Sequence, residues 1–402
     1  MTEQFRLKLN RQAWQKLMLL LTSVMVIMAD LTVSPILPKI QEAFPDVENI
    51  NLLVKMVLTT PAIFIVISSP FVGYLLDKYG RKNIILISIF IYVLAGTSGV
   101  YAKSIYEILI GRAFLGIATG GVINGCSALI GDYYRGAEIN RIIGLQSSFI
   151  GYGGLMCLFL GGLLGDIHWR ATFLVYLLPL ALLVLFVRYI DEPEIKEKAF
   201  SATGKLLLPD NRYLKKLGML YLIAFGLMIF FYMLPLQIPF YLRSIMSINN
   251  TQIGLTIATM TFFSATTAIF YKRIKSILSF RSVFIAAFII MGLGYVTVSA
   301  VPEYMFSLLG MVFTGIGMGL IVPNLRTWVG SYSDSFFLGR AYGGLNASVY
   351  LGQFFSPIVV NQVINITSVA SSFAIAGLFM MAVALFFVFI SPRRYKPQEN
   401  SG

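Results

Sequence analysis

The fold is decided by residues 73–82, which read Gly-Tyr-Leu-Leu-Asp-Lys-Tyr-Gly-Arg-Lys and lie between two long apolar runs. Gly80 permits a tight turn, and Gly73 permits the close approach of a neighbouring helix. Asp77 can face the N-terminus of a neighbouring helix, where a negative charge is favoured. The stretch therefore indicates two membrane-spanning helices joined by a short hairpin, with its basic residues held on one side of the membrane.

The composition extends this interpretation to the whole chain. Of its 402 residues 57% are hydrophobic and 12% are charged, whereas soluble domains carry about 25% charged residues. Runs such as 171–187 and 369–390 are long enough for helices that cross a bilayer, which need about 20 apolar residues. A membrane barrel would show short alternating segments instead. The sequence therefore predicts an all-α membrane protein.

We place twelve spans along the chain. Their approximate limits are 15–38, 52–76, 83–102, 105–130, 142–165, 171–189, 216–242, 253–271, 283–301, 305–328, 341–364 and 369–391.

The basic residues set the orientation, because cytoplasmic loops are enriched in Lys and Arg. With the N-terminus in the cytoplasm, 25 of the 31 basic residues, Arg326 among them, fall in cytoplasmic segments, and Arg112 lies inside a span. The outer segments receive five: Lys39, Lys55, Lys103, Arg170 and Arg243. Both termini are thus predicted to be cytoplasmic, and the short loops favour a bacterial cytoplasmic (inner) membrane. The net charge of +13 follows from this topology, with the lipid bilayer and not nucleic acid as partner.

A charged segment divides the spans six and six. We predict an N-terminal six-helix bundle at 1–190, a cytoplasmic linker at 191–215 and a C-terminal six-helix bundle at 216–402. Phe-Leu-Gly-Ile at 114–117 with Gly120 resembles Phe-Thr-Gly-Ile at 313–316 with Gly319, at an offset of 199 residues. Such a repeat is typical of transporters that bind their substrate near the membrane midplane, between two halves.

The loop at 73–82 resembles the signature of the major facilitator superfamily, G-x-L-x-D-[RK]-x-G-[RK]-[RK]. The resemblance implies a major facilitator fold in which this loop acts as a conformational latch. We therefore expect Gly73, Asp77, Gly80 and Arg81 to have that role. Asp132 and Arg135, in the loop after the fourth span, are expected to pair with them. The corresponding second-half loop at 271–275 lacks the Asp and the Gly, so any latch is one-sided.

Three further stretches resemble the drug:proton antiporter branch of this family. Residues 30–38 resemble its first-helix pattern D-x-T-V-x-x-x-L-P, Leu109 with Arg112 and Gly116 its fourth-helix motif, and residues 169–173 its W-R-x-x-F. The fifth-helix motif G-x-x-x-G-P-x-x-G-G is matched at three of five positions, with Cys and Leu at 157–158 in place of Gly-Pro.

Asp30 and Arg112 are charges inside predicted spans, where charge is costly and usually functional. They lie about eight and seven residues from the outer ends of their spans, roughly 12 and 10 Å at 1.5 Å per residue. In the family the first and fourth helices line the central cavity, so the two could meet there. We expect them to form a proton-coupled switch, because burial and the distance to a cation together decide whether a carboxyl holds its proton. The alternatives are a static ion pair and no contact.

Polar residues inside other spans are candidates for lining the substrate cavity. Gln237 lies between Pro235 and Pro239, whose rings free nearby backbone carbonyls. The other candidates are Tyr232, Asn124, Asn324 and Asn346, with Gln353 as a further polar residue in a span.

The favoured function is proton-driven export of an amphipathic small molecule, a drug or a metabolite, by alternating access of a monomer. The first alternative is an importer or uniporter of a sugar or organic acid, although spans seven to twelve hold almost no charge for an anion. A membrane enzyme or scramblase is disfavoured, because the sequence shows no catalytic His/Asp or Cys/His arrangement. A channel is disfavoured because no filter motif appears. We expect no metal and no cofactor.

Overall fold

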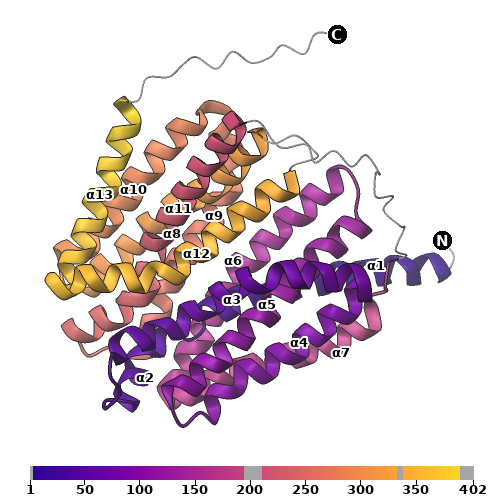
Figure 1. Ribbon diagram of the computed structural model, residues 1–402, viewed down its shortest axis with the longest axis horizontal. Coiled ribbons are helices and arrows are strands. Elements are labelled where there is room, and N and C mark those ends of the chain that lie inside the picture. Colours follow the sequence, from indigo (N-terminus) through magenta and orange to yellow (C-terminus); the bar gives the residue numbers. More distant parts are fainter. Residues whose placement is uncertain (1–2, 194–210, 333–337, 390–402) are drawn as a thin grey trace.

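The computed structural model describes residues 3–193, 211–332 and 338–389, and these residues form helices and turns without a strand (Figure 1). Twelve helical segments are long and apolar enough to cross a membrane, which confirms the predicted number. Much of the predicted linker, residues 194–210, lies outside the described part of the chain.

The N-half is the described residues 3–193. Its elements are α1 (Glu3–Leu31), η1 (Ser34–Ile36), α2 (Leu37–Ala43), α3 (Ile50–Tyr79), α4 (Arg81–Thr97), η2 (Ser98–Val100), α5 (Ile105–Tyr133), α6 (Ala137–Ile167), η3 (Trp169–Leu177) and α7 (Leu178–Tyr189).

The C-half is the described residues from 211 onward. Its elements are α8 (Asn211–Ile245), α9 (Asn250–Ile277), α10 (Phe280–Ala300), α11 (Tyr304–Tyr332), α12 (Leu338–Ile366) and α13 (Val369–Phe389).

The first span is longer than predicted and is broken in the middle. It runs from Arg11 to Ala43, and its helix stops at Leu31, before a 3-10 turn and α2. Pro35 explains the break, because it has no N–H to donate to the carbonyl four residues earlier. Asp30 therefore lies in the last turn of α1, near the middle of the span and 13 residues from its end at Ala43, not eight.

The two halves repeat the same packing, with α1 to α7 matched by α8 to α13. In the N-half, α5 packs against α3 and α4, and α1 packs against α6. In the C-half, α11 packs against α9 and α10, and α8 packs against α12. Figure 1 shows the two groups of helices side by side, in indigo to magenta and in rose to yellow. The order of helices is the same in both, as expected of a parallel repeat.

The glycines that suggested the repeat lie at equivalent contacts. Gly116 packs against the backbone carbonyl of Pro61, where α5 crosses α3. Gly315 packs against the carbonyl of Met260, where α11 crosses α9. Small residues let membrane helices approach this closely. The offset of 199 residues therefore reflects the same helix crossing built twice.

The molecule has two faces that differ in how the halves meet. We call the one at which α1 begins and α13 ends the terminal face; its loops lie near residues 80, 134–136 and 278–279. The opposite, distal face has its loops at 44–49, 101–104, 246–249, 301–303 and 367–368. Contacts between the halves run through α6 with α9 and through α3 with α12. The hydrogen bonds that cross between the halves, described next, lie from the middle of the molecule toward the distal face.

Candidate transport site and gates

Asp30 lies at the interface between the halves and is bound by the opposite half. It is 5% exposed. Gln353 Nε2 of α12 donates to its Oδ1 at 3.2 Å, and Tyr232 Oη of α8 donates to its Oδ2 at 3.4 Å. Two elements of the C-half thus hold an acid of the N-half at the point where α1 ends.

Arg112 is buried within the N-half, 2% exposed. Its guanidinium lies over two aromatic rings, 5.2 Å from the centre of Phe173 and 4.9 Å from that of Tyr176. Its Nη1 donates to Tyr176 Oη at 2.8 Å, and that hydroxyl donates to the backbone oxygen of Met28 at 3.1 Å. Its Nη2 has no partner in the described structure. Contacts with aromatic faces are worth up to about 2 kcal/mol each when dry, so they offset part of the burial of this charge.

Asp30 and Arg112 do not form an ion pair in this structure. Among the described residues no carboxylate oxygen lies within 4 Å of Arg112, so the static pair that the sequence allowed is absent here. The two charges still interact through space. Their connection runs through the Tyr176 hydroxyl to Met28, one half-turn of α1 before Asp30. The acid faces the opposite half because α1 turns that side toward α8 and α12.

A comparison of the halves shows that the contact between Arg112 and Tyr176 is present in the N-half and has no counterpart in the C-half. Tyr92 Oη donates to the carbonyl of Met25 in α1 at 2.7 Å, and Tyr295 Oη donates to the carbonyl of Phe230 in α8, so the repeat is kept there. Beside Tyr92 lies Tyr176, with ring centres 5.8 Å apart, and beside Tyr295 lies Phe373, at 6.2 Å. The tyrosine that binds Arg112 thus has a phenylalanine as its counterpart, which has no hydroxyl to hold a cation.

The distal side is closed by a set of hydrogen bonds between the halves, which we call the distal network. At its centre is Asp166, near the end of α6, which accepts bonds from the backbone N–H groups of Asn250 at 2.7 Å and Thr251 at 3.1 Å. These are the first residues of α9, and a carboxylate is favoured at a helix N-terminus. The Asn250 amide also donates to the carbonyl of Gly165 at 2.8 Å. One half therefore caps a helix of the other.

Small residues allow this close contact of α6 with α9. A Cβ added to Gly162 would lie 2.5 Å from the Asn250 carbonyl, and one added to Gly254 would lie 2.5 Å from the Leu158 carbonyl. Gly161 packs in the same way on the Thr32 carbonyl, at the break in the first span. The two glycines of the fifth-helix motif thus make tight contacts at the distal closure, although the motif's Gly-Pro is absent.

Three more contacts complete the distal network. Arg243 Nη1 of α8 donates to Glu42 Oε1 of α2 at 2.8 Å, and Lys55 Nζ of α3 donates to Asn361 Oδ1 of α12 at 2.8 Å. Ser34 donates its hydroxyl to the Pro235 carbonyl. That carbonyl is free because Pro239, four residues later, has no N–H, as the paired prolines predicted.

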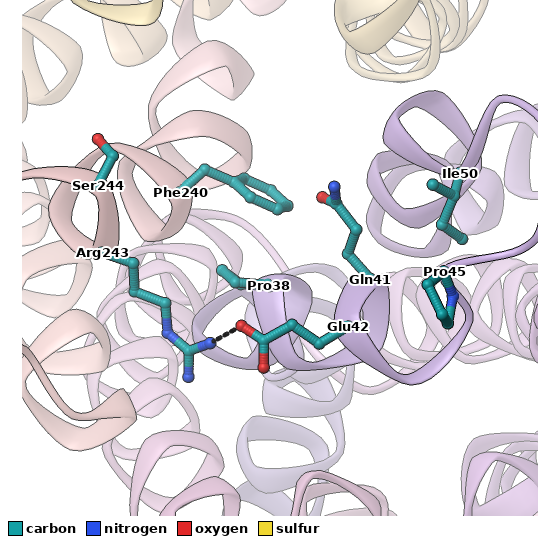
Figure 2. Close-up of a pocket in the computed structure, with 8 residues that line it drawn as sticks. All are labelled: Pro38, Gln41, Glu42, Pro45, Ile50, Phe240, Arg243 and Ser244. Atoms are coloured by element: carbon teal, nitrogen blue, oxygen red, sulfur yellow. Dashed lines mark hydrogen bonds and ion pairs between the residues drawn. The ribbon is translucent and has the colours of Figure 1, made fainter.

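A pocket of about 470 Å³ opens above this closure on the distal face. In Figure 2 the Phe240 ring and the Gln41 side chain lie opposite each other, above the Arg243–Glu42 ion pair. The pocket is lined by Pro38, Gln41, Glu42, Pro45 and Ile50 of the N-half and by Phe240, Arg243 and Ser244 of the C-half.

The signature loop forms a second network, on the terminal face and within the N-half. Arg81 Nε donates to Asp132 Oδ2 at 3.1 Å, as expected, and Arg81 Nη2 lies 3.4 Å from Asp77 Oδ1. Gly80 has a φ of +89°, which explains why glycine is needed at this turn. The N-terminus of α4 is capped by Glu192, which accepts from Arg81 N at 2.6 Å and from Lys82 N at 2.8 Å.

Three expectations for this loop are not met in the conformation described. Asp77 is largely exposed, and the acid at a helix N-terminus is Glu192 instead. No atom of the described residues lies within 4 Å of a Cβ built on Gly73, so none of the described helices makes a close approach there. Arg135 makes no ion pair with any described residue. The expectations for Asp77 and Gly73 fail for the same reason. These two residues are four positions apart on one side of α3, and that side faces away from the helices that pack on α3.

The cavity candidates separate into two groups. Tyr232 and Gln353 bind Asp30, as described above. Asn346 is exposed and lies one turn before Tyr350 on α12, on the helix face that leads to Gln353. The Tyr350 hydroxyl interacts electrostatically with Asp30. These residues therefore form one polar stripe at the interface between the halves.

The remaining candidates lie inside the bundles. Asn324 is fully buried, accepts from Tyr271 Oη at 3.0 Å and donates to the Phe280 carbonyl at 2.9 Å, which makes it a link between helices and not a cavity residue. Asn124 donates to Ser69 Oγ at 3.2 Å, between α5 and α3. Gln237 is 1% exposed, and neither atom of its amide has a partner among the described residues.

Arg326 and Lys55 were counted with the segments outside the membrane, although the predicted limits 305–328 and 52–76 enclose them, and each lies five or six residues inside its helix. Arg326 is in α11, six residues before its end, and its charge acts on the Tyr350 hydroxyl. Lys55 is in α3 and is 6% exposed. Glu192 was also missed, because its charged neighbourhood was interpreted as linker. A lysine so close to a long apolar run was the one signal that could have identified Lys55.

The comparisons with known proteins agree with this architecture. The chain matches the Major Facilitator Superfamily over residues 19–249 and 220–402. It is 26% identical over 383 residues to an uncharacterized MFS-type transporter, YwfA, of Bacillus subtilis, covering 91% of this chain and 88% of that one. It is 24% identical to the bacillibactin exporter of the same organism, covering 91% and 93%. A crystal structure of a D-xylose–proton symporter superposes with a TM-score of 0.77 at 15% identity, covering 94% and 97%. From the twelve spans, the repeated halves and these matches, the chain belongs to the major facilitator superfamily.

Proposed function

We propose that this transporter exports an amphipathic small molecule in exchange for protons across a bacterial cytoplasmic membrane. The terminal face would be cytoplasmic, because the sequence places most of its basic residues in segments on that side. The structure would then represent the state that is closed to the outside. The relative that exports bacillibactin, similar over most of both chains, supports the direction of transport.

The position of Asp30 is the observation that carries the proposal. It is the acid at the middle of the interface, and both of its hydrogen bonds come from the opposite half. Hydrogen bonds to an ionised carboxylate are stronger than those to a neutral group. Loss of the proton therefore tightens the outward closure, and gain of a proton loosens it. The charge of this one group is thus linked to the relative position of the halves.

This linkage provides a cycle for exchange. With Asp30 ionised and no substrate bound, Gln353 and Tyr232 hold the distal side closed. A substrate entering from the terminal face would compete for these donors and release the halves. After substrate leaves on the distal side, Asp30 is hydrated, and closure with the carboxylate ionised would strip that water before Gln353 and Tyr232 reach it, which is costly. A proton from the distal side would remove this cost, so the halves would close again over a neutral acid that is held more weakly than the ionised one. The proton would leave toward the terminal face, and the ionised acid would bind its two partners again.

The interface supports a substrate that is partly aromatic or apolar. Tyr152 and Phe262 pack against each other across the halves, with ring centres 6.1 Å apart. On α12, Phe354 and Phe355 are adjacent to Gln353. Asn346 and Tyr350 add hydrogen-bonding groups to the same face. This mixture of rings and a few polar groups is typical of small-molecule sites.

The alternative, transport of an organic acid, gains one specific observation. Arg326 places a positive charge in α11 of the C-half, near Tyr350, where the sequence suggested almost none. An anionic group could pair with it.

The test is transport in proteoliposomes with an imposed pH gradient and a panel of amphipathic cations, neutral molecules and carboxylates. If transport is an exchange for protons, a compound that enters the vesicles drives protons out, so the internal pH should rise as the compound accumulates. A fall in internal pH would indicate symport and no change would indicate uniport, and either result contradicts the proposal.

Asp30→Asn should fold normally and lose transport against a gradient, while exchange of substrate for substrate continues. The matched control is Asp46→Asn, an exposed acid of a distal loop that makes no hydrogen bond or ion pair with a described residue. Full accumulation by Asp30→Asn would exclude Asp30 as the coupling group.

A further inference from the structure

Lys55 is a buried cation that the mechanism above does not use. It lies in α3, five residues from the distal end of that helix, or about 8 Å at 1.5 Å per residue. Its ammonium contacts two groups, and both belong to the opposite half. These are the Asn361 amide oxygen at 2.8 Å and the face of the Phe240 ring at 5.6 Å.

Among the described residues no acid neutralises this lysine. On the elements that contact α3, and on α8, whose Phe240 touches the ammonium, the charged groups toward the distal side are Asp30, Lys39, Glu42, Glu107, Arg112 and Arg243. None of the three carboxylates lies within 4 Å of the Lys55 ammonium. Glu42 is already paired with Arg243, and Asp30 is held by two donors of the C-half. Lys55 is therefore buried among neutral partners.

The balance of energies favours removing this charge from the interior. Burying an ammonium without a counter-ion costs several kcal/mol even after relaxation. A cation–π contact returns about 0.5–2 kcal/mol, and a hydrogen bond from a charged group about 1.5–3 kcal/mol. Both partners would move away with the C-half if the distal side opened, and water would reach the ammonium in their place.

Solvent is close to this site even in the closed state. Phe240 forms one wall of the 470 Å³ distal pocket, and Ile50, in the first turn of the same helix as Lys55, forms another part (Figure 2). The ring of Phe240 therefore lies between the pocket and the ammonium.

We propose that Lys55 is a charge-sensitive element of the distal gate, whose positive charge favours the open state because closure buries it without a counter-ion. Acid on the distal side, which keeps the amine charged, then promotes opening. Alkali, which removes the proton to the distal solvent, promotes closure. This inference concerns the gate alone and holds whether or not transport is coupled to protons through Asp30.

The test measures the width of the distal side in lipid nanodiscs by electron–electron distance spectroscopy. Spin labels are attached through Asp46→Cys in the N-half and Thr367→Cys in the C-half, two exposed positions on distal loops. The native Cys126 and Cys157 are buried. As the pH rises into the range where the amine loses its proton, the ratio of open to closed molecules should fall, by at most about tenfold per pH unit for one proton.

Over the alkaline range in which the amine of the parent protein loses its proton, Lys55→Met should stay closed and show no response to pH, and Lys55→Arg, which does not lose its charge, should keep the open population. Lys103→Met, an exposed lysine of a distal loop, is the control and should behave like the parent protein. Asp30→Asn should retain the response to pH. Two results would overturn the proposal. One is a distance distribution of the parent protein that is independent of pH, and the other is a shift of Lys55→Met toward the open state. The latter would mean that the Lys55–Asn361 bond simply holds the halves together.

Discussion

Gly315 of α11 packs against the carbonyl of Met260 of α9 so closely that a Cβ at this glycine would lie 2.5 Å from the oxygen. The same contact occurs in the N-half between Gly116 and Pro61. In each half, two helices can therefore come into backbone contact at this crossing only because glycine has no side chain. Space at this crossing, and not backbone flexibility, is the reason for glycine, because both residues lie inside regular helices.

Gly315→Ala should therefore destabilise the protein. The new methyl group has no space, and overpacking costs about 1–3 kcal/mol. Gly73→Ala is the matched control, since no atom lies within 4 Å of its added Cβ, and alanine is about 1 kcal/mol more favourable than glycine in a helix. Thermal unfolding in detergent should show a lower Tm for the first variant and an equal or higher Tm for the second. A lower Tm for Gly73→Ala would contradict the open space described at this glycine and would support the close helix approach that the sequence suggested.

The extent to which sequence predicted the fold follows from what each signal measures. Hydropathy detects burial in lipid, so all twelve spans could be found. The repeat was visible at Gly116 and Gly315 because the same crossing needs the same small residue. The rotation of each helix about its axis has no comparable signal. The pairing of Asp30 with Gln353, 323 residues away, and not with Arg112, could therefore not be predicted.

Counting basic residues explains the other errors. The positive-inside rule assigns a Lys or Arg near a helix end to a loop, and so it hid Lys55 and Arg326 within spans. The same emphasis on composition gave Glu192 to a linker, although it caps α4. The distal network could not be inferred at all, because Asp166 and Asn250 come together only when two separate bundles meet.

Glu192→Ala should loosen the terminal end of the N-half. The carboxylate accepts from the first two N–H groups of α4, and loss of a helix cap costs about 0.5–2 kcal/mol. The Tm should fall by a few degrees. Glu48→Ala, at an exposed distal position, is the control and should leave the Tm unchanged. Equal Tm values for the two variants would show that the cap contributes no net stability.

Asp166→Asn should open the distal side. The substitution removes the negative charge from the N-terminus of α9 and weakens the bonds to Asn250 and Thr251. Loss of one charge-assisted hydrogen bond is worth about 1.5–3 kcal/mol, so the ratio of open to closed molecules should rise about tenfold or more. The distance between the labels at residues 46 and 367 provides the measurement.

The direction of this change is informative in itself. Asp166→Asn removes a negative charge that stabilises closure, whereas Lys55→Met removes a positive charge that opposes it. The two variants should therefore shift the same distance distribution in opposite directions. A shift in the same direction would show that the distal side responds to any disturbance of its packing.

Gln353→Leu should make the transporter leak protons without substrate. The change leaves Asp30 and its charge in place but removes the donor that holds its Oδ1 at 3.2 Å. Without that bond, an ionised and empty carrier is no longer held in the closed state, so the halves can exchange positions and carry protons alone. Proteoliposomes with an imposed pH gradient and no substrate should lose that gradient faster than those with the parent protein. The matched control is Asn346→Leu, two turns earlier on α12, whose side chain makes no hydrogen bond with a described residue. It should raise the KM for substrate and leave the proton permeability unchanged. If Gln353→Leu preserves the gradient while Asn346→Leu dissipates it, the restraint on the empty carrier lies nearer the terminal face than Asp30.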